Sequence, residues 1–166
     1  MKRVTGFTLM EMMVVLAIVA ILATIAIPPV VSATAKEQVN ESLDLLKRLA
    51  PAVELYQLQN GELPANNEEA GLPPPTKLLG NYIDRIELED GAFHLHFGNK
   101  AVSMLKDKVI SVRAIVVTGS PASPMSWVCA YSGIPEGMFS PAQNLSTVPQ
   151  KFLPLRCRDK VIPEKT

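Results

Sequence analysis

The residues whose chemistry is easiest to interpret lie at the start of the chain. Glu11 is a lone carboxylate at the edge of an apolar run, because no residue from Met12 to Val31 carries a charge. An ionisable group in such a place costs roughly a few kcal/mol in lipid unless a partner neutralises it. The basic residues Lys2 and Arg3 come before it, and Gly6 separates the two parts. The pattern predicts a segment that resides in a membrane and later pairs Glu11 with a positive group.

Cys129 and Cys157 are a pair of reactive side chains late in the sequence, and the chain has no other cysteine. The basic leader would stay on the cytoplasmic side of a membrane, which places the rest of the chain on the oxidising side. A disulfide is therefore the expected state of the two cysteines. On the chain-entropy estimate such a bond would contribute about 3–4 kcal/mol to stability.

His94 and His96 are spaced for a metal site, since alternate residues of a strand share one face. Two histidines without further ligands do not make such a site, so we expect them to face solvent and expect no metal. The sequence shows no phosphate-binding glycine loop, no pair of catalytic carboxylates and no histidine–cysteine arrangement. The sequence therefore predicts neither an enzyme nor a cofactor.

The overall charge argues against broad, nonspecific nucleic-acid binding. The 166 residues hold 16 basic and 16 acidic side chains, and removal of the leader with Lys2 and Arg3 would leave the chain slightly acidic. Nonspecific binding needs a net basic surface. A basic cluster near the C-terminus could contact DNA or another anionic surface, although a solubilising role is the favoured interpretation. Its members are Lys151, Arg156, Arg158, Lys160 and Lys165.

A long helix is expected to carry the N-terminal residues. Beyond the apolar run, apolar residues recur at helical spacing on one face: Val39, Leu43, Leu46, Leu49, Val53 and Tyr56. Asn60-Gly61 is a stop signal. Pro28 and Pro29 should kink or locally break this helix, whereas Pro51 should add a milder bend without ending it.

Four strands are expected after the helix, with a hairpin turn at Asp90-Gly91. They cover residues 82–88, 93–97, 109–118 and 126–131. Phe93, Leu95 and Phe97 would pack on the helix. The expected fold class is α+β, with an antiparallel meander laid over the second half of the helix and a disulfide-bounded region, 129–157, at the end.

Two ordinary explanations of the N-terminus fit poorly. A secretory signal is cleaved after its apolar core, whereas Gly6 lies before it. A plain single-span anchor would have no use for Glu11.

The N-terminus resembles the type IV prepilin family. The resemblance rests on Gly6, on the following Phe7-Thr8-Leu9-Met10-Glu11, and on an apolar helix ending in Ile25-Ala26-Ile27-Pro28. It implies cleavage after Gly6 by a prepilin peptidase, N-methylation of Phe7 and assembly into a filament through the helix. Glu11 would pair with the Phe7 amine of a neighbouring subunit, and Pro28 stands where the family has a proline. Ala20 departs from the family, which usually has glycine there.

Two further segments resemble the major type IVa pilins. One is the loop from Gly61 to Gly71, with Pro64, Asn66 and Asn67 at matching places, and the other is the ending from Leu153 to Asp159. The resemblance divides the chain into four parts. These are a cleaved leader (1–6), a membrane and filament-core helix (7–31), an amphipathic helix (32–60) and a globular head (61–166).

The resemblance implies a structural subunit of a type IV pilus, serving adhesion, twitching motility and DNA uptake. Its partners would be other copies of itself, the prepilin peptidase and the assembly machinery of the bacterial inner membrane. It would reside in that membrane before assembly and in the extracellular pilus afterwards. The alternative is a minor or competence pilin that binds DNA or primes assembly. A type II secretion pseudopilin fits less well, because that class typically lacks the cysteine-bounded ending.

Overall fold

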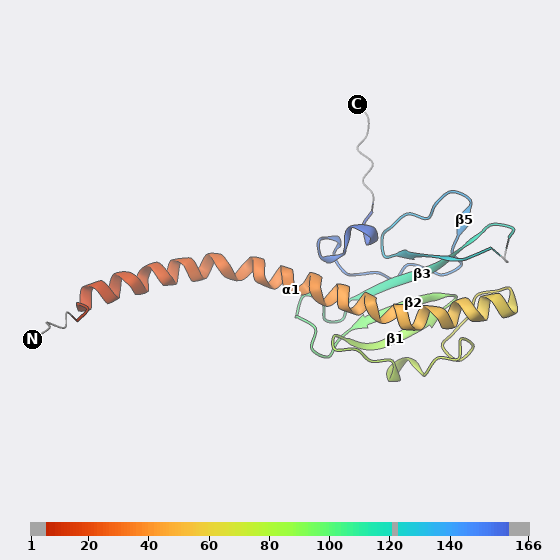
Figure 1. The fold of residues 1–166 in the computed structure, drawn as a ribbon, viewed down its shortest axis with the longest axis horizontal. Helices are drawn as coiled ribbons and strands as arrows, with labels where there is room; N and C mark the ends of the chain where they lie inside the picture. The colour runs from red at the N-terminus through yellow and green to blue at the C-terminus, as the bar shows by residue number, and fades with distance from the viewer. Residues whose placement is uncertain (1–5, 121–122, 160–166) are drawn as a thin grey trace, which may run out of the picture. The chain divides into compact units, whose positions relative to one another are not determined.

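The computed structural model describes residues 6–120 and 123–159, except that the side chains of residues 24–31 are not described. The chain divides into two compact units, Met1–Thr34 and Ala35–Thr166. The helix α1 (Leu9–Asn60) supplies the regular structure of the first unit and also enters the second (Figure 1).

The expected end of α1 is confirmed at Asn60. Gly61 follows with a φ of +75°, and its amide donates to the carbonyl of Gln57 at 2.8 Å. The side chain of Asn60 donates to the carbonyl of Tyr56 at 2.9 Å. A glycine with positive φ directly after a helix satisfies the last carbonyls in this way without strain.

The prolines do not divide the helix. Pro51 lies inside α1 and is exposed, so the expected continuity at this position is confirmed. The expected local break at Pro28 and Pro29 is not seen, because α1 continues through both. Each proline removes one backbone donor, but the hydrogen bonds on either side can keep the helix continuous.

The second unit holds an antiparallel meander in the order β1-β2-β3-β4 (Figure 1). Its strands are β1 (Ile83–Glu89), β2 (Ala92–Phe97), β3 (Val109–Val117) and β4 (Ser126–Cys129). A short strand that was not expected, β5 (Met138–Phe139), pairs with Val116 and Val117 of β3. Among its described residues the unit also has the 3₁₀-helices η1 (Pro75–Lys77), η2 (Gln150–Phe152) and η3 (Leu155–Cys157).

The turn between β1 and β2 is the expected hairpin. Asp90 and Gly91 have φ angles of +46° and +79°, and two successive positive values are typical of a type I′ turn. A Cβ on Gly91 would lie 2.8 Å from a methyl carbon of Leu63. The glycine therefore serves both the turn and the close contact with the loop that follows α1.

The core of the second unit lies between α1 and one face of the sheet. Phe93, Leu95 and Phe97 are buried with Val39 and Val53 of the helix, which confirms the expected pattern. The ring of Trp127 in β4 stacks on Phe93 with centroids 5.6 Å apart, and its Nε1 donates to Glu54 at 3.2 Å. Strand β4 is thereby fixed to both the sheet and the helix.

The expectation that His94 and His96 face solvent is wrong. Only 1% of His94 is exposed, and His96 is largely buried as well. Both lie on the sheet face opposite the core. The chain after β5 returns along β3, and the amide of Leu145 bonds to Ser111, the direct neighbour of His94. This return could not be read from strand periodicity, because the segment forms no long strand.

Candidate functional site

The expected cleavage position lies outside the helix. Gly6 and Phe7 are exposed and have no regular secondary structure, and α1 begins two residues later, at Leu9. In the described part of the chain, no atom beyond the adjacent residues lies within 4 Å of where a Cβ on Gly6 would sit. The peptide between Gly6 and Phe7 is therefore accessible, and residues 1–5 of the leader lie outside the described part of the chain.

Glu11 and Thr8 cap the start of α1 reciprocally. The amide of Glu11 donates to the Thr8 hydroxyl at 3.2 Å, and the amide of Thr8 donates to the Glu11 carboxylate at 3.5 Å. This is a capping box, in which two side chains satisfy two of the free donors at a helix start. The negative charge also lies in the first turn, where the helix dipole favours it. Glu11 thus has a role inside its own subunit.

The surface around Glu11 is apolar and exposed. Phe7 is 79% exposed, and eleven further large apolar side chains are exposed with it among the described residues of the first unit. They are Leu9, Met10, Met12, Met13, Val14, Val15, Leu16, Ile18, Val19, Ile21 and Leu22. In the part of the chain that the structure describes, no helix is both long enough and apolar enough to cross a membrane. A contiguous apolar surface of this kind marks an interaction site.

The other residue expected to act in assembly is Pro28. It lies in α1, but its side chain is outside the described residues. The structure therefore brings together Gly6, Phe7 and Glu11 at the start of the helix.

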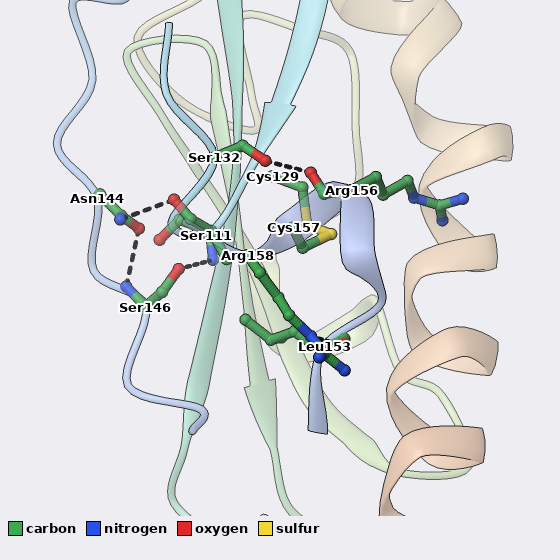
Figure 2. Close-up of a disulfide and its surroundings, with 10 residues drawn as sticks. Ser111, Cys129, Ser132, Asn144, Ser146, Leu153, Arg156, Cys157 and Arg158 are labelled. Atoms are coloured by element: carbon green, nitrogen blue, oxygen red, sulfur yellow. Dashed lines mark hydrogen bonds between the residues drawn. A yellow bond between two sulfur atoms is a disulfide. The ribbon is translucent and has the colours of Figure 1, made fainter. Parts of the chain in front are cut away.

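Cys129 and Cys157 form the expected disulfide, with an S–S distance of 2.09 Å. The bond joins the end of β4 to η3, and Figure 2 shows the side chains around it. Next to it, the hydroxyl of Ser132 donates to the carbonyl of Arg156. The amide of Tyr131 donates to the carbonyl of Cys157 at 3.1 Å. The two ends of the disulfide-bounded region are therefore joined by hydrogen bonds as well as by the covalent link.

The middle of this region is held against β3 by polar side chains. We call residues 144–148 the return segment. Ser146 Oγ accepts from the amide of Ser111 at 3.0 Å, and Thr147 Oγ1 accepts from the amide of Val109 at 2.9 Å. Asn144 donates to the carbonyl of Ala130 at 2.8 Å (Figure 2). The return segment thus satisfies the edge of β3 beyond the point where β4 ends.

Comparison with known proteins matches both parts of the chain. Residues 35–158 match the family model described as pilin (bacterial filament). Residues 1–27 match the prokaryotic N-terminal methylation motif. The chain belongs to the pilin family. Its long helix, antiparallel sheet and C-terminal disulfide agree with the α+β fold of type IV pilins, and the family consists of filament subunits rather than enzymes.

Individual relatives are similar over nearly the whole chain. A fimbrial protein of Neisseria meningitidis serogroup B is 33% identical over 163 residues, which cover 93% of this chain and 94% of the relative. A type IV major pilin protein, PilE1, of Neisseria gonorrhoeae is 34% identical over 158 residues and 93% of each chain. A fimbrial protein of Pseudomonas aeruginosa is 30% identical over 144 residues, covering 81% of this chain and 90% of the relative.

Glu89, His94 and Ser111 of this pilin lie in a row that resembles a catalytic triad. They are on the sheet face opposite the core. His94 Nδ1 lies 2.9 Å from Ser111 Oγ, and His94 Nε2 lies 3.8 Å from Glu89. However, Ser111 is fully buried and its Oγ already accepts the amide of Leu145 at 2.8 Å. A nucleophile must reach its substrate, so this arrangement supports the structure and does not form an active site.

His96 takes part in a separate contact on the same face. Arg85 donates to His96 Nδ1 at 2.9 Å, so the ring carries its proton on Nε2, 3.6 Å from Glu87. Burial and the nearby Arg85 lower the pKa of His96. Within residues 6–120 and 123–159, no three histidine, cysteine or acidic side chains are gathered as a metal would require.

The basic cluster near the C-terminus is partly engaged inside the pilin. The amine of Lys151 lies 5.0 Å from the ring centroid of Phe152, and Arg158 Nε donates to the carbonyl of Leu153 at 2.8 Å. Lys160 and Lys165 lie outside the described residues. Two of the cations that could bind DNA thus have structural contacts.

Sequence reasoning missed the role of Thr8. The spacing Thr8-x-x-Glu11 before an apolar run is the signature of a capping box. The apolar run around Glu11 predicts only a positive partner for its carboxylate and gives no sign of a bond within the subunit. The motif identifies Thr8 as the residue that fixes where the helix begins.

Proposed function

We propose that this pilin is the major structural subunit of a type IV pilus. A peptidase cleaves it after Gly6, Phe7 is N-methylated, and the subunit assembles with other copies through the first half of α1. The observation that carries the proposal is the similarity over 93% of both chains to a protein named as a type IV major pilin. The methylation motif at residues 1–27 supports the processing steps.

The N-terminal unit has the properties that assembly requires. Its apolar side chains are exposed in a single subunit and need a cover. In our proposal, the lipid of the bacterial inner membrane covers residues 7–31 before assembly, and neighbouring helices cover them in the filament. The leader (1–6) stays cytoplasmic with Lys2 and Arg3, in agreement with the positive-inside rule.

In this proposal, Glu11 sets the axial register between neighbouring subunits. Its carboxylate lies at the start of α1 among apolar side chains, four residues after Phe7. In a water-poor filament core an unpaired carboxylate is costly, whereas the amine of Phe7 on a neighbouring subunit would neutralise it. Methylation leaves that amine positively charged. The pairing would set the axial position of one subunit against the next.

The extracellular filament would serve adhesion and twitching motility, and DNA uptake is a further role of such filaments. A minor or competence pilin is the second candidate, and the Lys151, Arg156 and Arg158 cluster is the feature in its favour. The two candidates differ in abundance. A major pilin forms the bulk of the filament, whereas a minor pilin is present in few copies.

The test is quantitative mass spectrometry of filaments sheared from cells, with a strain that lacks this gene as the control. We expect this chain to be the most abundant protein of the sheared fraction and filaments to be absent from the deletion strain. A chain found in trace amounts within filaments built from another pilin would establish the minor role. Filaments that persist unchanged without the gene would contradict the proposal.

A further inference from the structure

We propose that His94 is a proton-sensitive latch, which holds the return segment (144–148) against β3 while neutral and releases it when protonated. The latch lies in the head, on the sheet face opposite α1. It does not depend on whether the chain is a major or a minor pilin.

The latch assigns a position to the proton of Ser111 and to that of His94. The Oγ of Ser111 accepts the amide of Leu145 at 2.8 Å and lies 2.9 Å from His94 Nδ1. In the latch, the hydroxyl proton of Ser111 is directed to Nδ1, which is unprotonated in the neutral ring and accepts it. Neutral His94 then carries its own proton on Nε2, on the side of Glu89.

Protonation disturbs the side of the ring that contacts the return segment. The added proton goes to Nδ1, which becomes a donor and can no longer accept from Ser111. The Ser111 hydroxyl must turn away from the ring although the residue is fully buried. A buried hydroxyl that loses its acceptor is destabilising. The cost of protonation therefore falls on Ser111, whose Oγ also accepts the amide of Leu145 from the return segment.

The charges around His94 do not remove this cost. Burial is the largest influence and lowers the pKa of His94. Glu89 and Glu87 of β1 act in the opposite direction, whereas His96 of β2 and Arg113 of β3 add to the lowering. The return segment supplies no charged side chain, since it reads Asn-Leu-Ser-Thr-Val. The neutral ring is therefore the form that the closed structure favours.

The return segment is the part of the surroundings that can yield most easily. His94 belongs to β2, which is hydrogen-bonded to β1 on one side and β3 on the other. Residues 144–147 lie mostly at the surface and are attached by separate hydrogen bonds, to Val109 and Ser111 of β3 and to Ala130 and Tyr131. Val148 is buried in the core and anchors the end of the segment. Opening the segment lets water reach His94 without breaking the sheet, and the Cys129–Cys157 bond keeps the opened region attached.

Protonation of His94 favours the open state of the return segment. The pKa of His94 is lowered in the closed state and returns toward 6.5 when water reaches the ring. The open state therefore binds the proton more strongly, and the closed state loses stability as the pH falls below 6.5. One linked proton changes the closed-to-open ratio by at most about tenfold for each pH unit.

The test is hydrogen exchange of the mature full-length subunit in detergent micelles, with its disulfide intact. Exchange in a peptide covering residues 141–148 is followed from pH 7.5 to 5.0 and corrected for the intrinsic effect of pH. We expect protection in this peptide to fall by up to about tenfold for each pH unit below 6.5. Peptides from β1 and β2 should keep their protection.

Two matched variants identify the responsible group. His94→Gln removes the titrating ring and should abolish the pH dependence, whereas His96→Gln removes the neighbouring ring, which bonds to Arg85, and should retain it. The proposal is wrong if the wild type shows no loss specific to the segment. It is also wrong if the loss persists in His94→Gln or disappears in His96→Gln.

Nitrogen NMR of the wild-type ring provides a second measurement in case His94→Gln does not fold. We expect the proton of neutral His94 on Nε2 at pH 7.5, and a titration midpoint shared by the ring and the Leu145 amide. A proton on Nδ1, or two different midpoints, would overturn the latch.

Discussion

At the scale of single residues, Glu11 combines two roles that are separable in principle. Its carboxylate accepts the amide of Thr8 within the subunit, and in the proposed filament it pairs with a neighbouring Phe7 amine. A glutamine at position 11 could still accept the Thr8 amide but would carry no charge. The two roles can therefore be tested apart by choosing the substitution.

Glycine at position 6 is needed by the peptidase and not by the fold of the subunit. Among the described residues, none beyond the adjacent ones lies within 4 Å of a Cβ at this position, so Gly6→Val should leave the subunit's own fold intact. We expect an uncleaved precursor in cells, because a branched side chain should not fit where the peptidase needs glycine. Mass spectrometry of the N-terminus measures this, with Val4→Ala as the control. Normal cleavage of Gly6→Val would show that the site is read in another way.

At the scale of elements, the β1–β2 turn depends on Gly91. Gly91→Ala would place a Cβ 2.8 Å from Leu63 and would put a non-glycine residue at a φ of +79°. We expect a loss of about 1–2 kcal/mol in the free energy of unfolding, from the left-handed backbone alone. Gly133→Ala is the control, because Gly133 has open space and no positive φ. Equal stability of the two variants in urea unfolding would refute this account of the turn.

The disulfide is expected to stabilise one region more than the rest. Removing it should lower the free energy of unfolding by about 3–4 kcal/mol. Residues 130–156 should loosen first, since the stretch between Tyr131 and Thr147 is held largely by isolated hydrogen bonds. Val148, Phe152 and Leu153 share the core with β1, β2 and α1 and should loosen last within this region. Hydrogen exchange of reduced wild type and of the Cys129→Ala/Cys157→Ala double variant would show this. A uniform loss of protection across the head would contradict it.

The elements whose apolar residues recur at regular spacing could be predicted from the sequence, and the segments without such spacing could not. A short stretch of sequence is enough to predict three features. These are the helical spacing through Val39 and Val53, the turn at Asp90-Gly91 and the alternation in β2. The burial of His94 depends on the return segment, which docks through serine and threonine contacts to a strand more than thirty residues earlier. No local pattern encodes such docking.

The candidate site follows the same division. The processing motif and the cysteine pair could be recognised by residue type and spacing. The reciprocal bonds of Thr8 and Glu11 follow from an equally local motif, the spacing of a capping box. The apolar run beside it indicates only that the charge of Glu11 needs a partner. The side-chain structure around Pro28 is not described, so its role in assembly stays a prediction.

At the scale of the whole molecule, two units have separate tasks in the proposed filament. The first carries an exposed apolar helix with one carboxylate at its start, and the second carries its own core and disulfide. Substitutions at Glu11 should therefore affect assembly and leave the head folded. A subunit with an altered Glu11 should accumulate in the membrane with a normal Cys129–Cys157 bond.

The measurement that tests the central claim most directly is filament yield relative to subunit level in cells that express one variant alone. Glu11→Gln and Glu11→Val should both give few or no filaments, because both remove the charge that pairs with Phe7. Thr8→Ala, which costs about 0.5–2 kcal/mol of helix capping but keeps the charge, should still give filaments. Normal filaments from Glu11→Gln would contradict the account, since capping and apolar packing would then suffice for assembly.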